Sequence, residues 1–319
     1  MPTPANGNST FTFVQLSDPH LSSLRRVRIR DLLNKRVLGY LSWRLHRSAE
    51  HPREVLSALT HDLGRVRPDH IVITGDLTQI GLPSEFRLAR EWLSCLGSPW
   101  DVTVIPGNHD AYVPQAWERS FGLWAPYMLS DGMPAGAEAT MHPQAMFPTL
   151  RVRGSVALIG LSSARPSAPF LAVGSLGSDQ LRKLEQILKE TGQQALCRIL
   201  LIHHPPLPDT VAWRKRLTDS ASLRTVLARH GAELVLHGHA HRTCVAEFST
   251  SSGSIPAIGV PSASAQGRTP DRRARYHIYR LTRNIEGWEL LISVRGYSSA
   301  ENRFMAEGAT CLTVRRPAV

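Results

Sequence analysis

Five short segments of this 319-residue sequence carry Asp, Asn or His directly after a stretch that predicts a buried strand. In chain order the segments are Asp18-Pro19-His20, Gly75-Asp76, Gly107-Asn108-His109-Asp110, His203-His204 and Gly238-His239-Ala240-His241. One such segment would mean little, because an Asp or His after a strand is common. Five of them, spread over about 220 residues, predict a site for two metal ions at the edge of a sheet.

The strands themselves are predicted from continuous apolar runs bounded by Gly and Pro, which are typical of strands buried on both faces. The runs are 11–16, 71–74, 102–105, 156–161, 199–202 and 234–236. Between them, the residue pattern predicts a helix at 52–63, a second capped by Ser84 and a third capped by Ser178. This alternation indicates an α/β protein, in which ligands bind at the carboxyl ends of the strands.

The pattern changes from about residue 255 onward, where strand-like runs follow one another without long helices. These runs are 255–260, 276–281 and 288–294, and we expect them to complete a second sheet packed on the first. With no linker and no repeat in view, we expect one domain over 11–314, preceded by a disordered N-terminus at 1–10.

The charge is strongly basic, with a formal net charge of +11, which favours anionic partners such as phosphate substrates, acidic lipids or nucleic acid. An apolar insertion lies at about 21–50, and between Leu21 and Arg47 it carries eight Lys or Arg residues against one acid, Asp31. The eight are Arg25, Arg26, Arg28, Arg30, Lys35, Arg36, Arg44 and Arg47. We expect a helix that begins near Asp31 and leaves Lys35, Ser42 and His46 on a narrow polar strip.

Three roles for this insertion stay open. The first is a helix docked on the body, with its Arg side chains reaching solvent. The second is a membrane-surface element or substrate cap that contacts anionic lipid through residues 24–47. Nucleic-acid binding is the least favoured. In the first two cases the insertion would lie over the metal site, because it follows Asp18 and His20 directly.

A second basic cluster lies near the C-terminus, at Arg268, Arg272, Arg273, Arg275, Arg280 and Arg283. We interpret it as a solvated face, with contact to a phosphate-rich substrate or headgroup as the alternative.

The expected location is the cytoplasm, with peripheral contact at the inner face of the membrane as an option. No run of eighteen apolar residues predicts a spanning helix, and the first ten residues do not resemble a secretory signal. The four cysteines lie far apart without a C-x-x-C pair, so we expect reduced thiols.

The residue types of the five segments restrict the metal. Asp, Asn and His suit Mn, Fe or Zn better than soft copper sites. Asp18 and His20 are separated by one residue, so on an extended strand end both would point to one side. A carboxylate such as Asp76 has two oxygens and can bridge two cations.

The order of the segments resembles the calcineurin-like metallophosphoesterases, whose pattern D-x-H, G-D, G-N-H-D/E, H and G-H-x-H is matched over roughly 11–245. The resemblance implies a four-layer αββα sandwich of two mixed sheets with a binuclear centre at the strand ends. It places Asp18, His20, Asp76 and His241 on the first metal. Asp76 as a bridge, with Asn108, His203 and His239, would hold the second metal.

The same resemblance implies the chemistry. His109 would contact the substrate phosphate or protonate the leaving oxygen, and a hydroxide bridging the metals would attack phosphorus in line. Mn and Fe are the expected metals, with Zn as an alternative.

Three assignments stay open at this stage. His204 competes with His203, which we favour because it directly ends the apolar run, and His237 competes with His239. Asp110 either orients His109 or caps the following segment.

Several subfamilies fit less well than others. The Ser/Thr protein phosphatases carry a second Asp three residues after G-D, where this chain has Gln79. The standard UDP-diacylglucosamine hydrolases have Arg in place of His109. The layout most resembles the class III cyclic nucleotide and glycerophosphodiester phosphodiesterases, which implies hydrolysis of a soluble phosphodiester.

Two alternatives to a soluble diesterase remain. One is a membrane-surface hydrolase of a lipid-linked phosphoester or pyrophosphate such as UDP-diacylglucosamine. The other is a non-catalytic scaffold that has kept its metal site. The complete ligand set speaks against the scaffold.

Overall fold

The computed structural model describes residues 10–21, 24–133, 143–250, 253–267, 269–285 and 287–315. The expected disordered N-terminus, 1–10, lies outside these ranges except for Thr10. The single domain predicted over 11–314 stays a prediction. In the described part of the chain, no helix has both the length and the apolar character needed to cross a membrane.

Two six-stranded sheets form the centre of the fold. The first has the order β12-β11-β10-β1-β2-β3, and the second β4-β5-β6-β7-β9-β8. The first sheet comprises β1 (Phe11–Leu16), β2 (His70–Ile73), β3 (Val102–Val104), β10 (Arg275–Arg283), β11 (Gly287–Ser298) and β12 (Arg303–Arg315). The second comprises β4 (Thr149–Arg153), β5 (Val156–Gly160), β6 (Cys197–Leu201), β7 (Leu234–His237), β8 (Cys244–Thr250) and β9 (Gly253–Gly259).

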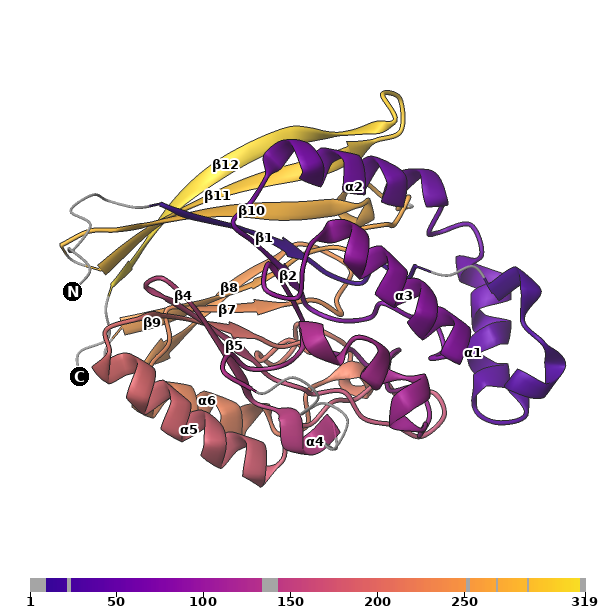
Figure 1. Ribbon diagram of the computed structural model, residues 1–319, viewed down its shortest axis with the longest axis horizontal. Helices are drawn as coiled ribbons and strands as arrows, with labels where there is room; N and C mark the ends of the chain where they lie inside the picture. The colour runs from indigo at the N-terminus through magenta and orange to yellow at the C-terminus, as the bar shows by residue number, and fades with distance from the viewer. Residues whose placement is uncertain are drawn as a thin grey trace.

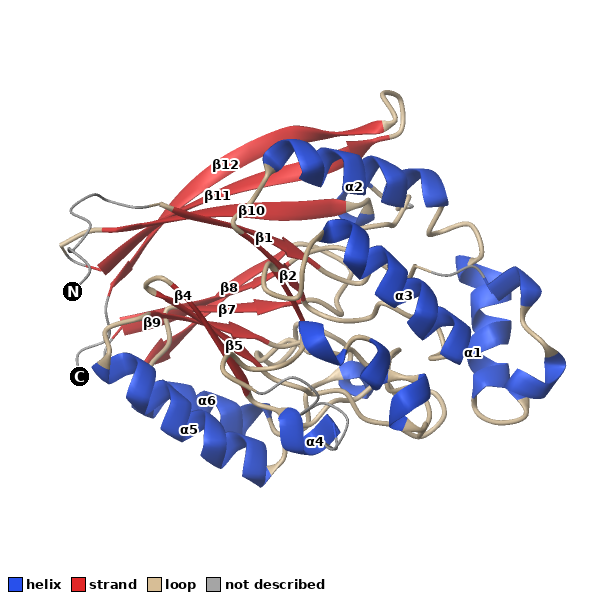
Figure 2. Ribbon diagram, viewed as in Figure 1, coloured by secondary structure: helices blue, strands red, loops and turns tan. Residues whose placement is uncertain are grey.

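Helices cover the outer faces of both sheets (Figures 1 and 2). Helices α2 (Arg53–Val66) and α3 (Pro83–Leu96) lie on the first sheet, and α5 (Ser178–Gln193) and α6 (Ser220–His230) on the second. Two shorter helices are α1 (Arg36–Ser42) and α4 (Pro143–Met146). The predicted four-layer αββα sandwich is confirmed.

The parallel strands position the five metal-ligand segments. In the first sheet β1, β2 and β3 run parallel, and in the second β5, β6, β7 and β9 do. All five segments directly follow β1, β2, β3, β6 and β7. The carboxyl ends of these strands therefore bring the five loops to one end of the sandwich.

The C-terminal strands are divided between the sheets, which corrects the expectation that they complete the second one. Only β9 joins the second sheet, whereas β10 pairs antiparallel with β1 and β11 and β12 extend the first. The segment Tyr276–Tyr279 of β10 is buried on both faces. Tyr276 donates a hydrogen bond to Asp62 of α2, and Tyr279 donates to Gln15, which in turn contacts the His237 carbonyl of the second sheet.

The start of α3 also differs from the prediction. The helix begins at Pro83, so Ser84 lies inside its first turn and does not cap it. The carboxylate of Glu85 accepts the backbone N–H groups of Gln79, Ile80 and Leu82 at 2.8–3.1 Å. Similarly, Ser178 is the first residue of α5, and Gly177 occupies the cap position.

The insertion at 21–50 docks on the body through a small core of its own. Leu24 and Trp43 are buried against Ile80 and Leu82, next to α3. The helix begins at Arg36 and not near Asp31, because the preceding residues form a short 3-10 turn at Ile29–Leu32. Beyond α1 the chain widens into a π-helical turn at Trp43–Arg47.

The side chains of the insertion also depart from the expected pattern. Arg36 does not reach solvent; it is buried and donates to the carbonyls of Ile80 and Gly81. Lys35 leaves the predicted polar strip and donates to Ser167 at 2.6 Å. The insertion is therefore fixed to the body by specific polar contacts.

A substitution at Gly39 tests how closely the insertion packs on the body. A Cβ at Gly39 would lie 2.6 Å from the Tyr112 hydroxyl and 2.7 Å from Ile80, whereas one at Gly64 in α2 meets nothing within 4 Å. We expect Gly39→Ala to lower the free energy of unfolding by about 1–3 kcal/mol through overpacking. Gly64→Ala should raise it by up to about 1 kcal/mol. Urea denaturation measures both; equal stability of the two variants would contradict the close packing.

Candidate metal centre

Five candidate ligand residues share a backbone conformation that L-residues seldom adopt. Their φ angles are positive: Asp18 51°, His20 41°, Asp76 57°, His239 65° and His241 49°. These residues lie in loops beyond the ends of β1, β2 and β7, so the expected extended geometry of Asp18 and His20 was wrong. Backbone strain of this kind concentrates at functional sites, where surrounding contacts hold it in place.

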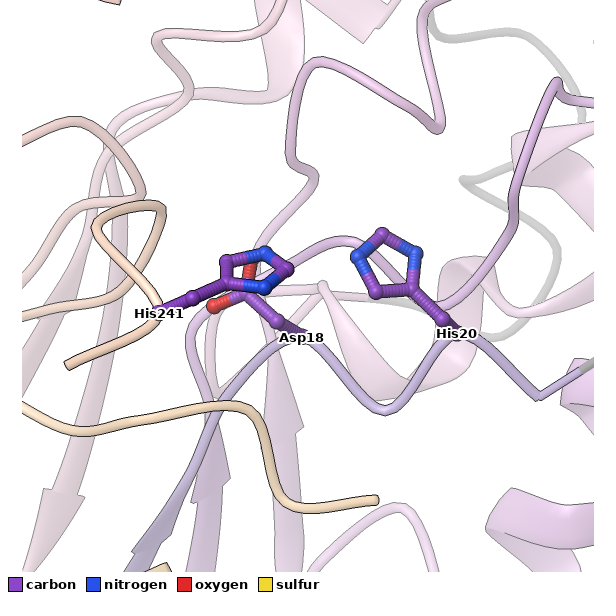
Figure 3. A group of neighbouring side chains, drawn as sticks. All are labelled: Asp18, His20 and His241. Atoms are coloured by element: carbon purple, nitrogen blue, oxygen red, sulfur yellow. The ribbon is translucent and has the colours of Figure 1, made fainter. Parts of the chain in front are cut away.

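The loops bring the candidate ligands into three groups whose ligand atoms lie within 4.8 Å of one another. The groups are Asp18 with His20 and His241, His20 with Asp76 and His109, and Asp76 with His203 and His239. Figure 3 shows the first group, with the rings of His20 and His241, 5.3 Å apart, turned to the same space beside Asp18. Since Asp76 belongs to two groups, it lies where a bridging ligand would be needed.

Distances within the groups support a shared cation. His241 Nε2 lies 3.1 Å from Asp18 Oδ1. His203 Nε2 lies 3.3 Å from Asp76 Oδ2 and 3.2 Å from Asn108 Oδ1. The structure thus brings together all seven residues that the sequence assigns to the two metals, with His109 beside them.

In three of the buried candidate ligands, one ring nitrogen is held by a backbone carbonyl. His20 Nδ1 donates to Thr78, His203 Nδ1 to Thr74 and His239 Nε2 to Lys215, at 2.7–3.0 Å. These bonds fix the orientation of each ring and turn its other nitrogen toward the site, as in known metal centres.

Two buried atoms of the candidate ligands have no hydrogen-bond partner in the described chain, namely His20 Nε2 and, apart from its 3.1 Å ion-pair contact with His241 Nε2, Asp18 Oδ1. Such atoms are costly unless something else satisfies them. Asp18 Oδ2, in contrast, accepts from Ser17 Oγ at 2.6 Å and from the His239 backbone N–H at 3.0 Å. One oxygen is thus fixed while the other is available to a cation, so the residues present fit a metal.

The electrostatics of the site follow from burial and opposite charge. Burial raises the pKa of Asp18, but His241, His203 and His20 together outweigh this effect and bring the pKa well below its usual range. Burial lowers the pKa of His203, but the carboxylates of Asp76 and Asp18 raise it to about 9. The pKa of His20 falls to about 3, chiefly through burial. Asp18 therefore carries a negative charge that a cation would neutralise.

Two glycines allow the loops to approach this closely. A Cβ at Gly107 would lie 2.2 Å from Asp76 Oδ1, and one at Gly238 would lie 1.8 Å from Ser17 Oγ. Both contacts are sterically forbidden, so only glycine fits. The Gly-containing segments are consequently needed for packing as well as for ligand placement.

The structure separates the histidines that the sequence left as alternatives. His204 engages both ring nitrogens, with Ser163 and the Ala172 carbonyl, and His237 belongs to none of the three groups. The geometry therefore favours His203 and His239 as ligands.

Asp110 has a role that neither earlier interpretation included. Its carboxylate accepts the backbone N–H groups of Asp76, Thr78 and Gly107, each at 2.9 Å. It thereby ties the loop after β2 to the loop after β3. Burial and the nearby Asp76 charge raise the pKa of Asp110 to about 7, against the effect of these hydrogen bonds.

A cleft of about 550 Å³ opens onto the ligand groups. Five basic residues line it, together with His46, Glu50, His51 and His109. The basic residues are Arg47, Arg214, Lys215, Arg242 and Arg272. Arg272 belongs to the second basic cluster, whereas Arg273 and Arg275 pair with Glu307.

Arg47, His51 and Lys215 were missed as site residues from the sequence. His51 lies beside His20, with ring centroids 4.8 Å apart, and its Nε2 is buried without a partner in the described chain. The only signal in the sequence was that these residues lie near the D-x-H segment or in basic runs. Such proximity does not show which side chains face the cleft.

Comparison with known proteins identifies the family. The model of the calcineurin-like phosphoesterases matches residues 11–243, so the chain belongs to this family. A probable cyclic nucleotide phosphodiesterase of Synechococcus sp. is 28% identical over 228 residues, 70% of this chain and 76% of that protein. A probable glycerophosphodiester phosphodiesterase of Arcobacter nitrofigilis is 26% identical, over 72% of this chain and 71% of its own.

A further relative and a solved structure agree with this result. The 3′,5′-cyclic adenosine monophosphate phosphodiesterase of Escherichia coli is 26% identical, covering 75% of this chain and 72% of its own. A dimetal phosphatase from Danio rerio, 13% identical, superposes with a TM-score of 0.56 over 93% of this chain and 98% of its own, which shows the fold. Members of the family bind a binuclear metal centre, and the three groups are candidate sites for it.

Metal binding can be tested without any substrate. Titrating metal-free protein with Mn²⁺ should raise its melting temperature, because a ligand at a hundredfold its Kd adds about 2.7 kcal/mol of stability. Asp76→Ala should remove most of this gain, since Asp76 takes part in two of the three groups. The exposed Glu91→Ala is the control and should respond like the wild type. An undiminished Mn²⁺ response of Asp76→Ala would contradict the assignment.

Proposed function

We propose that this phosphoesterase hydrolyses a soluble phosphodiester of the cyclic nucleotide or glycerophosphodiester type. The observation that carries the proposal is the cleft, which has the volume of a nucleotide-sized ligand and five basic side chains over the candidate metal ligands. The relatives named as phosphodiesterases support the same substrate class.

In this proposal one cation is held by Asp18, His20, Asp76 and His241. The other is held by Asp76, Asn108, His203 and His239. Two bound cations supply the positive charge that stabilises a transferring phosphoryl group and activates water at neutral pH. Mn and Fe are the metals we expect, with Zn as the alternative.

His109 is the proposed catalytic residue. Its Nδ1 is bonded to the Gln79 carbonyl, its backbone N–H donates to Asp76 Oδ1 at 2.7 Å, and its ring stacks beside Tyr112. The ring is thus held at the cleft with Nδ1 as the donor to the Gln79 carbonyl. In this proposal Nε2 donates to the phosphate or to the leaving oxygen from the imidazolium form. Burial lowers the pKa of His109 to about 3, and the charge of the bound phosphate would stabilise the imidazolium against this effect.

The test compares a 3′,5′-cyclic nucleotide, a glycerophosphodiester and glycerol 3-phosphate on Mn-loaded protein. We expect kcat/KM for one of the diesters to exceed that for the monoester by about tenfold or more. His109→Ala should lower kcat for that diester about a hundredfold. The same variant is also measured with bis(p-nitrophenyl) phosphate, whose leaving group needs no proton. If His109→Ala loses less kcat on this substrate than on the diester, His109 donates a proton to the leaving oxygen. If the loss is equal on both substrates, His109 contacts the phosphate.

Two results would overturn the proposal. One is a preference for the monoester. The other is diester turnover that persists in Asp76→Ala at the wild-type rate.

A second candidate function is suggested by the outer surface of the insertion. Ile29, Leu33 and Leu45 are 82%, 79% and 74% exposed, and Val37 and Leu41 continue this apolar patch at intervals of four residues. The exposed Arg25, Arg28 and Arg30 lie in the same segment. An apolar face among basic residues suits an anionic lipid surface. Association with a second copy would bring like charges together, which is unfavourable.

The corresponding function is hydrolysis of a lipid-linked phosphoester or pyrophosphate at a membrane surface. The wild type should sediment with vesicles containing phosphatidylglycerol, more weakly at high salt, and the Leu33→Gln, Leu45→Gln double variant should not. Ile285→Gln, on the exposed β10–β11 turn, is the matched control. Absence of wild-type binding, or self-association without vesicles, would exclude this candidate.

A further inference from the structure

The insertion contributes a side chain to the cleft that the family pattern does not include. Arg47 ends the π-helical turn at Trp43–Arg47 and lines the same cleft as Asp76, Asn108 and His109. Turns of this type occur often at functional sites. The neighbouring Trp43 is buried against the body, which fixes the end of the helix relative to the cleft.

The Arg47 side chain is half-buried and lacks the partners that a guanidinium in such a position normally has. Its Nε is buried and has no hydrogen-bond partner, and no carboxylate lies within ion-pair distance of it in the described residues. Burial lowers the pKa of Arg47, while the charge of Arg47 contributes to lowering the pKa values of His20, His51 and His109. Its charge therefore acts directly on the candidate metal site.

An arginine in this position is energetically unfavourable unless it binds an anion. Withdrawing a guanidinium from water is unfavourable when nothing compensates its charge and its N–H groups. A phosphoryl group provides both, because its oxygens accept parallel hydrogen bonds from the planar guanidinium. The other residues that hold the insertion in place, Arg36 and Lys35, already have protein partners.

We propose that Arg47 is a substrate-binding residue, which holds a non-reacting oxygen of the phosphoryl group at the metal site. The insertion would then be the wall of the catalytic cleft that binds the substrate anion. This inference rests on the proposed phosphoesterase function and adds a specific substrate contact to it. It does not depend on whether the outer face of the insertion meets lipid.

The test uses Arg47→Gln and Arg47→Lys in the full Mn-loaded chain, with Arg44→Gln as the control. Arg44 lies on the same helical turn but is exposed. We expect Arg47→Gln to raise KM for the diester and the inhibition constant of inorganic phosphate about ten- to hundredfold. Arg47→Lys should give an intermediate effect, because it keeps the charge without the paired donors. Arg44→Gln should stay within about threefold of the wild type.

Two further measurements separate substrate binding from structural support. The metal content of each variant should equal that of the wild type, and calorimetry should show the same loss of phosphate affinity without any turnover. Should Arg47→Gln fail to fold, Arg47→Lys carries the test. Wild-type phosphate affinity and KM in the folded variants would overturn the inference. If the wild type hydrolyses no diester but Arg47→Gln still loses phosphate affinity, the proposed function fails and the Arg47 contact stands.

Discussion

The rest of the site depends on one constraint, which is that two carboxylates, Asp18 and Asp76, are buried. A buried carboxylate is unfavourable unless it is hydrogen-bonded and its charge is compensated. The protein supplies the hydrogen bonds from Ser17, from the His239 backbone and from the His109 backbone. It compensates the charge only in part, through the nearby histidines. A pair of cations is the simplest addition that completes the balance.

The same constraint explains the loop geometry. Backbone atoms of one loop approach the carboxylates of another, which requires Gly107 and Gly238 at the closest points. It also requires several ligand residues to adopt positive φ angles, a cost that the contacts between loops must exceed. Asp110 connects the loops after β2 and β3 through three backbone N–H groups. The double-sheet architecture matters because it brings these loops to one end from both sheets.

Much of the fold and the grouping of the candidate ligands could be predicted because each candidate ligand follows a strongly apolar strand. The strands were recognisable from local sequence, and because parallel strands have their carboxyl ends at the same edge of a sheet, the segments that follow them lie close together. The predictions that were wrong concerned features that depend on tertiary contacts. The partner of β10 is set by the open edge of β1 and the packing of Tyr276 and Tyr279, which no local pattern encodes. The start of α3 is stabilised by Glu85 inside its first turn, whose carboxylate reaches back to the preceding loop, and not by Ser84.

The insertion shows this limit most clearly. Its apolar residues read as one broad face, but docking buries Trp43 and leaves Leu33 and Leu45 in solvent. Likewise, the sequence lists Arg36 and Arg47 as equivalent charges, whereas one is bonded to backbone carbonyls and the other faces the cleft. Which arginine serves structure and which serves the substrate is decided by neighbours distant in the chain, such as Ile80 and Asp76.

The measurement that tests the central claim most directly is an anomalous difference map from crystals of the Mn-loaded protein. The account predicts two peaks at the carboxyl ends of the strands, both in contact with Asp76. One should also contact Asp18, His20 and His241, and the other Asn108, His203 and His239. A single peak, or two peaks that do not share Asp76, would contradict it.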